Sequence, residues 1–193
     1  MTRAYSLFEK SHEPVALLDW WYSRATFCVI QNGYPKFVRL LRKSGFRQVM
    51  DEISRGFNLD RQQAREVVTN FGLEGCSSDD SSRGEGPGAD QASIQQAFND
   101  LVRDPVNMIS TEIKRTVHFL EKQQKILAPV KLVLFGGGAV MKNVAPILES
   151  KVRIHTEAWG GNTGIRTPGN LPLPLIANAV ALSALPLSKP PVT

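Results

Sequence analysis

Residues 131–150 read KLVLFGGGAVMKNVAPILES, and this stretch decides the fold of the chain. An apolar run over residues 130–135 is broken by three glycines, and apolar residues resume at helical spacing over residues 143–150. The pattern predicts a strand, a glycine loop and a helix. In an α/β protein such a loop, beside a helix N-terminus, often holds a nucleotide. The alternative is a tight turn in which the glycines are needed only because the backbone adopts positive φ values.

Length and composition indicate one globular domain. The chain has 193 residues, 42% of them hydrophobic and 21% charged, which is enough for one core and short for two full domains. The net charge of +5 is too small to indicate nucleic-acid binding by itself. Cys28 and Cys76 have no second cysteine or histidine at zinc-ligand spacing, and two cysteines fit a reducing compartment.

No targeting or membrane segment is recognisable in the sequence. No run approaches the roughly 18 apolar residues that a membrane span needs. The N-terminus also lacks the apolar centre of a secretion signal. We therefore expect a cytoplasmic protein without direct membrane insertion.

Three predicted strands open the chain, at residues 15–19, 25–30 and 34–42. Asn32-Gly33 is a strong signal for a hairpin turn, so these strands are predicted to form an antiparallel meander. Before them, residues 4–9 look like the last turns of a helix at a domain boundary.

The next elements are predicted to be helical. Two amphipathic helices follow, the first opened by Ser44-Gly45 and the second capped by residues 58–60, and both should cover a sheet. Residues 74–90 are rich in glycine, serine and aspartate and predict a mobile loop. A long helix is predicted over residues 92–125, with a break at Asp104-Pro105.

After residues 131–150 we expect a strand at 152–156, a loop at 157–172 and a helix at 173–185. Strands separated by helices must cross over and lie parallel. The prediction is therefore an α/β, ribonuclease-H-like domain of the actin type. Its mixed sheet has the order 3-2-1-4-5, with helices on both faces. One subdomain spans residues 1–187, divided into 12–73, 74–90 and 91–187, and a tail follows at 188–193.

Residues 5–187 resemble the second half of an actin-like ATPase of the PilM and FtsA family, whose members serve type IV pilus assembly and cell division. Three segments carry the resemblance. Residues 17–26 occupy the place of the phosphate-2 loop, residues 132–138 are similar to the adenosine motif, and residues 176–184 are similar to a C-terminal helix.

The resemblance implies a two-domain ATP clamp of which this chain supplies one half, the other half preceding Met1. It implies ATP as cofactor, with Mg²⁺ only together with ATP. The cofactor-binding residues carried over are Asp19, Thr26, Gly136, Gly137 and Gly138.

One part of the family pattern is missing. Alignment on Asp19 places Trp21 where the family has glycine, and Ala25 or Thr26 where it has a phosphate-contacting threonine. A tryptophan indole fills the space through which backbone amides approach phosphate oxygens. We therefore expect no hydrolysis unless a second domain completes the site. Asp19 either orients Mg²⁺-bound water or caps the following turn, as aspartates commonly do.

Trp20, Trp21 and Tyr22 are three consecutive large aromatic residues in a loop. They cannot all face one core, so they are predicted to form a protein-contact surface. The alternative is that they pack against another domain or under the long loop.

A basic region follows, without the interleaved aromatic residues that single-strand binders use, and this disfavours nucleic-acid binding. Its residues are Lys36, Arg39, Arg42, Lys43, Arg47 and Arg55.

The function predicted from these features is a scaffold without catalytic residues, which binds nucleotide weakly or not at all. Its expected partners are inner-membrane assembly proteins of a pilus or secretion system, met at the cytoplasmic face of the membrane. A homo-oligomer stays open. The alternatives are an ATP-binding half of an actin-like ATPase and a basic nucleic-acid-binding module.

Overall fold

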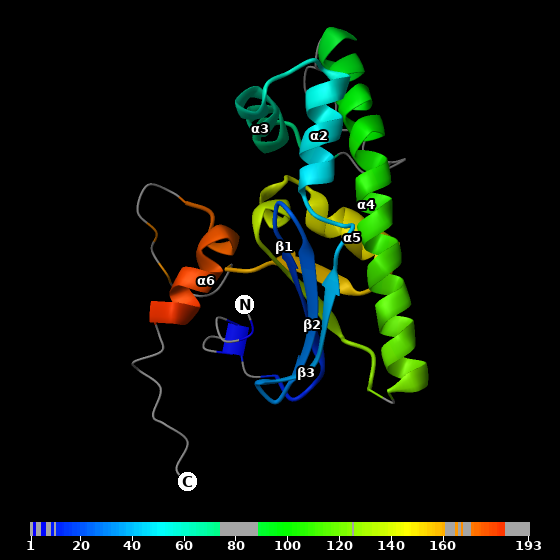
Figure 1. The fold of residues 1–193 in the computed structure, drawn as a ribbon, viewed down its shortest axis with the longest axis vertical. Coiled ribbons are helices and arrows are strands. Elements are labelled where there is room, and N and C mark those ends of the chain that lie inside the picture. Colours follow the sequence, from blue (N-terminus) through cyan, green and yellow to red (C-terminus); the bar gives the residue numbers. More distant parts are fainter. Residues whose placement is uncertain are drawn as a thin grey trace, which may run out of the picture.

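The computed structural model describes residues 2, 5, 6, 9, 11–73, 89–124, 126–160, 165, 167 and 171–183. Its strands are β1 (Val15–Trp20), β2 (Ala25–Gln31), β3 (Tyr34–Leu41), β4 (Lys131–Phe135) and β5 (His155–Ala158). Its helices are α2 (Arg47–Gly56), α3 (Arg61–Asn70), α4 (Ala89–Gln123), the 3₁₀ turn η1 (Gly137–Val140), α5 (Val144–Val152) and α6 (Leu173–Ser183). Figure 1 shows their arrangement.

The five strands form one sheet in the order β3-β2-β1-β4-β5, which confirms the predicted topology. β1, β2 and β3 pair antiparallel, whereas β4 runs parallel to both β1 and β5. The turn between β2 and β3 has φ of 53° at Asn32 and 78° at Gly33, the positive values that a tight hairpin turn requires.

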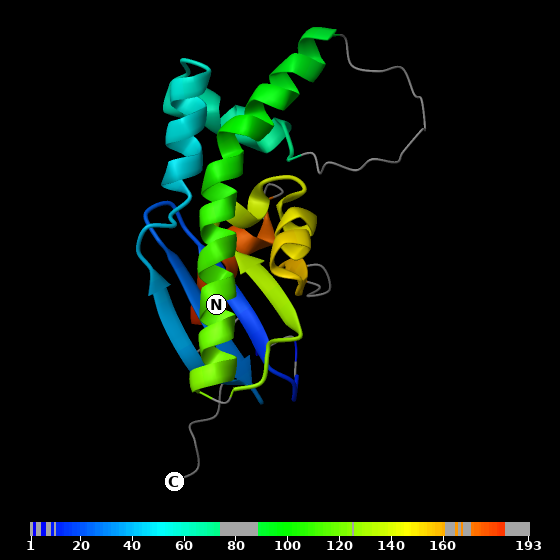
Figure 2. The same ribbon diagram turned by 90° about the vertical axis from the view of Figure 1, so that its right-hand side faces the viewer.

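Helices cover both faces of the sheet, as predicted. Side chains alternate along β1, so Ala16, Leu18 and Trp20 join one core cluster with α2, α3, α4 and α5. Val15 and Leu17 join a second cluster with Ala177 of α6 on the opposite face. Figures 1 and 2 show α4 lying across one face and α6 lying against the other.

The predicted break at Asp104-Pro105 is wrong, because α4 runs through Pro105 as one helix. Proline inside a helix removes one hydrogen bond and costs about 3 kcal/mol. Val102 and Val106 on either side are buried in the core, and this packing offsets the cost. Figure 2 shows the N-terminal part of the helix leaning away from the rest.

Two other predicted boundaries are displaced. Val152 ends α5 and is buried, Arg153 takes a left-handed φ of 59°, and β5 therefore begins only at His155. Residues 89 and 90 belong to α4 and not to the predicted loop, whose residues 74–88 lie outside the described residues. Of the predicted N-terminal helix, Tyr5 and Ser6 are helical, and the rest except Glu9 lies outside the described part.

Candidate functional site

Asp19 and Thr26, two of the predicted cofactor residues, face each other across the β1–β2 pair. The turn that joins these strands is closed by a hydrogen bond of 3.1 Å from the Trp21 amide to the Arg24 carbonyl. Both residues border a hollow of about 460 Å³, which we call the carboxylate pocket. Its other lining residues are Trp21, Tyr22, Ser23, Arg24 and Asn178 of α6.

Burial raises the pKa of the Asp19 carboxyl above its ordinary value, although a hydrogen bond with Trp21 acts in the opposite direction. A buried carboxylate loses hydration that its neutral form does not need. The folded state therefore holds this proton more tightly than the unfolded state does. The contribution of Asp19 to stability is therefore highest while its carboxyl is protonated, and it falls as the pH rises from the unfolded pKa, about 4, to the raised folded value.

We expect Asp19→Asn to remove the loss of stability that ionisation of Asp19 causes, because an amide carries no charge. The variant should gain stability relative to the unmodified chain at about pH 7, where Asp19 is ionised in the unfolded state, and less at about pH 4. Urea unfolding of both proteins at the two pH values measures the difference. An equal difference in the free energy of unfolding at both pH values would show that ionisation of the Asp19 carboxyl does not destabilise the folded state.

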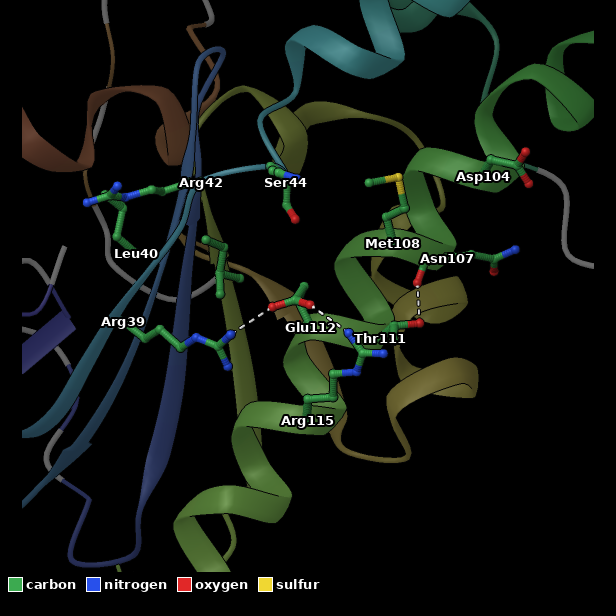
Figure 3. A pocket seen from close by; sticks show the side chains of 12 residues that line it. Arg39, Leu40, Arg42, Ser44, Asp104, Asn107, Met108, Thr111, Glu112 and Arg115 are labelled. Carbon is green, nitrogen blue, oxygen red and sulfur yellow. Dashed lines mark hydrogen bonds and ion pairs between the residues drawn. The ribbon is translucent and has the colours of Figure 1, made fainter.

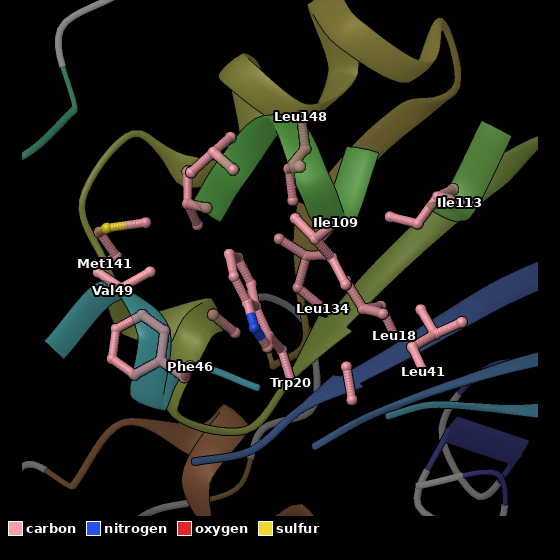
Figure 4. Close-up of a cluster of buried hydrophobic side chains, with 14 of the residues drawn as sticks. Leu18, Trp20, Leu41, Phe46, Val49, Ile109, Ile113, Leu134, Met141 and Leu148 are labelled. Atoms are coloured by element: carbon pink, nitrogen blue, oxygen red, sulfur yellow. The ribbon is translucent and has the colours of Figure 1, made fainter. Parts of the chain in front are cut away.

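Trp20 lies in the larger core cluster, with 1% of its surface exposed. Its ring meets Phe46 edge-on, at a centroid distance of 5.6 Å and an interplanar angle of 86°. Figure 4 shows the ring among apolar side chains from the sheet and the surrounding helices. The prediction that Trp20 belongs to a protein-contact surface is therefore wrong for its side chain.

The glycine loop packs on Trp20. Gly136 has φ of +81°, and a Cβ there would lie 2.7 Å from the Trp20 carbonyl oxygen. A Cβ on Gly138 would collide with the Trp20 ring. A Cβ on Gly137 would meet only Phe46, at 3.7 Å. The tight-turn alternative thus accounts for Gly136 and Gly138, whereas nucleotide contact by the three glycines stays a prediction.

Gly137 borders a second hollow of about 540 Å³ between the loop and helices α2 and α3, which we call the glycine-loop pocket. This volume is within the range of small-molecule sites. Its walls are mostly apolar, with Phe46, Met50 and Val68, and two arginines of α3, Arg61 and Arg65, stand at its side.

Trp21 and Tyr22 line both hollows and so form a shared aromatic wall between them. The wall is fixed by α2, since the Phe46 and Arg47 amides donate to the carbonyls of Trp21 and Tyr22 at 2.8 and 2.7 Å. Trp21 and Tyr22 are 37% and 40% exposed, which confirms that part of the aromatic run reaches the surface. The predicted cofactor residues are therefore divided, with Asp19 and Thr26 on one side of the wall and Gly137 on the other.

No protein-family model and no curated protein matches the sequence. Among solved structures, the chain is similar to one in a PilM-PilN type IV pilus biogenesis complex, with a TM-score of 0.71 and 20% identity over 97% of this chain and 51% of that one. It is also similar to MreB 5 of Spiroplasma citri bound to AMPPNP, with a TM-score of 0.62 and 13% identity over 94% of this chain and 56% of that one.

A third similar structure is the MamK double helical filament, with a TM-score of 0.60 and 14% identity over 98% of this chain and 58% of that one. The chain has an actin-like, ribonuclease-H-like fold. This actin-like domain spans just over half the length of each of these three structures.

Arg61 and Arg65 of the actin-like domain were not identified from the sequence. A capping box starts α3, in which Asp60 accepts from the Gln62 and Gln63 amides at 2.8 Å, and Gln63 accepts from the Asp60 amide at 3.0 Å. The two arginines lie one turn apart after this cap. Their spacing along the helix can be seen in the sequence, but the pocket beside them is built from segments that lie far apart in the chain.

Within the described part of the actin-like domain, no helix is long and apolar enough to cross a membrane. Among the same residues, no cluster of three histidine, cysteine, aspartate or glutamate side chains could hold a metal ion.

Proposed function

We propose that this actin-like domain is a PilM-like scaffold of a type IV pilus or secretion assembly, one that does not hydrolyse ATP. It acts through protein contacts at the cytoplasmic face of the inner membrane. The observation that carries the proposal is the aromatic wall of Trp21 and Tyr22 between the glycine-loop pocket and Asp19.

The wall opposes Mg-ATP chemistry for a physical reason. A triphosphate held at Gly137 would have to pass Trp21 and Tyr22 to bring Mg²⁺ near Asp19. Phosphate sites use backbone amides and cations, and large aromatic side chains block the approach of the backbone. The Trp21 amide is already bonded to Arg24 within its own turn.

The same wall suits a protein contact. Trp21 and Tyr22 are exposed, and the turn that carries them is held by backbone bonds to α2. Tryptophan and tyrosine in fixed positions are the residues that most often dominate binding energy at interfaces. The likeness to a chain of a PilM-PilN complex supports a partner from pilus assembly, and the likeness to a MamK filament leaves self-association open.

We expect Trp21→Ala and Tyr22→Ala each to weaken capture of a cognate PilN-type cytoplasmic segment by about tenfold or more, as interface hot spots do. Added Mg-ATP should change nothing. Leu127→Ala is the control, because Leu127 is 71% exposed just before β4, at the other end of the sheet from the wall. Capture that stays equal in all three variants would remove the aromatic wall from the interface.

Nucleotide binding is the second candidate, favoured by the glycine-loop pocket. Its volume of about 540 Å³ suits a nucleoside. Asp51 of the same lining is paired with Arg47, and Arg61 and Arg65 form no ion pair within the described part of the chain. Their charges are thus free for an anion. Under this candidate ATP, with its Mg²⁺, would bind with Gly136, Gly137 and Gly138 near the adenosine.

A further inference from the structure

We propose that the outer edge of β3 is a second protein-binding surface, which takes an acidic, extended segment of a partner as an additional strand. This surface is separate from the aromatic wall, and the proposal does not depend on the pilus assignment.

Among the described residues, β3 is the last strand of the sheet and pairs only with β2. In an antiparallel pair, alternate residues of an edge strand point their N–H and C=O groups away from the neighbour. No described element lies beyond β3, as Figure 2 shows at the edge of the sheet. Pro35 lacks an N–H, so we expect an added strand to pair from Lys36 to Leu41.

A groove of about 700 Å³ lies between this edge and α4. Figure 3 shows Arg39 of β3 and Arg115 of α4 both reaching Glu112. The two ion pairs measure 2.9 and 3.2 Å, and Arg39 also donates to Thr116 at 2.7 Å. Met108 adds a 43% exposed apolar side chain to the groove.

Apolar side chains are exposed on the other side of the same strand. Val38 is 61% exposed and Leu40 is 39% exposed. Because side chains alternate along a strand, a segment paired with β3 would place one set of side chains over the groove and the other beside Val38 and Leu40. Main-chain hydrogen bonds to β3 would give affinity, and the two sets of side chains on the added segment would give specificity.

The charges at this edge select an acidic partner. Lys36, Arg42 and Lys43 are exposed and have no described carboxylate partner, whereas Glu112 is already shared by two arginines. Cations on an edge strand discourage pairing with a second copy of the same edge, where Lys36 and Arg42 would meet like charges. An acidic strand would meet opposite charges instead.

A nucleic acid fits this groove less well. Its lining contains no aromatic side chain on which a base could stack. The unpaired backbone of an edge strand also matches a peptide and has no counterpart in a base or a sugar.

The test uses a labelled short peptide of alternating glutamate and valine, titrated into the 193-residue chain at up to about 1 mM. We expect saturable binding by fluorescence anisotropy, with slower amide hydrogen exchange along β3. Lys36→Glu with Arg42→Glu should weaken binding by about tenfold or more, since each reversal replaces attraction by repulsion. Trp21→Ala should leave it unchanged.

Lys114→Glu with Lys122→Glu is the matched control, because both lysines are exposed on α4 and the net charge changes equally. It should bind the peptide within about twofold of the unmodified chain, as expected for charges away from the contact. Absence of binding, an equal effect of both double variants, unchanged β3 exchange, or tighter binding of single-stranded DNA would overturn the proposal.

Discussion

Trp20→Ala is expected to lower the free energy of unfolding by about 3–5 kcal/mol, the usual cost of removing a large aromatic side chain from a core. The ring is buried between β1, the glycine loop and Phe46, and its loss leaves a cavity that the surrounding backbone cannot close. Urea unfolding followed by circular dichroism measures the effect without depending on tryptophan fluorescence.

Trp21→Ala is the control for this prediction, since it is the same change one residue further along. Its side chain is 37% exposed, so we expect a loss of about 1 kcal/mol or less. Equal losses for the two variants would contradict the separation of Trp20 from the aromatic wall.

Gly136→Ala is expected to cost about 3 kcal/mol. Its φ of 81° and ψ of −170° lie in a region that essentially only glycine occupies, at a cost of about 1–3 kcal/mol for other residues. The new Cβ would also press against the Trp20 backbone, which cannot move away as a side chain could. Thermal and urea unfolding of the variant measure the loss.

Gly137→Ala separates this packing role from a general sensitivity of the loop. A Cβ there meets only Phe46, at 3.7 Å, so we expect a change within about 1 kcal/mol. If both variants lose the same stability, the close packing of Gly136 on Trp20 is not what requires glycine in this loop.

The sheet was predictable because its signals are local. Asn32-Gly33 forms the hairpin, and the order of strands and helices requires parallel crossovers, so the order 3-2-1-4-5 could be derived before any contact was known. The fold could therefore be predicted from the turn signals and from the hydrophobic patterns of the strands.

The location of Trp20 depended on one residue of strand length. With the strand ended at Asp19, Trp20 belonged to a loop. In the structure β1 reaches Trp20, which continues the inward row of Ala16 and Leu18. Strand ends are the least certain part of a sequence pattern, and here the end decided which aromatic residue is buried.

The division of the site could not be derived from the sequence. Trp20 meets the glycine loop because β1 pairs with β4, Asp19 lying opposite Phe135. The wall of Trp21 and Tyr22 is held by bonds to α2. Contacts between segments so far apart in the chain leave no local pattern. The predicted cofactor-binding residues therefore looked like one site in the sequence, although the two pockets are separate in the structure.

Calorimetric titration of Mg-ATP into the chain tests most directly the central claim, that a domain whose aromatic wall separates Gly137 from Asp19 acts through protein contacts and does not use nucleotide. We predict no saturable heat with nucleotide at concentrations up to about 1 mM. Saturable binding with micromolar affinity, abolished by Gly137→Val, would contradict the account and make the nucleotide the natural ligand of the glycine-loop pocket.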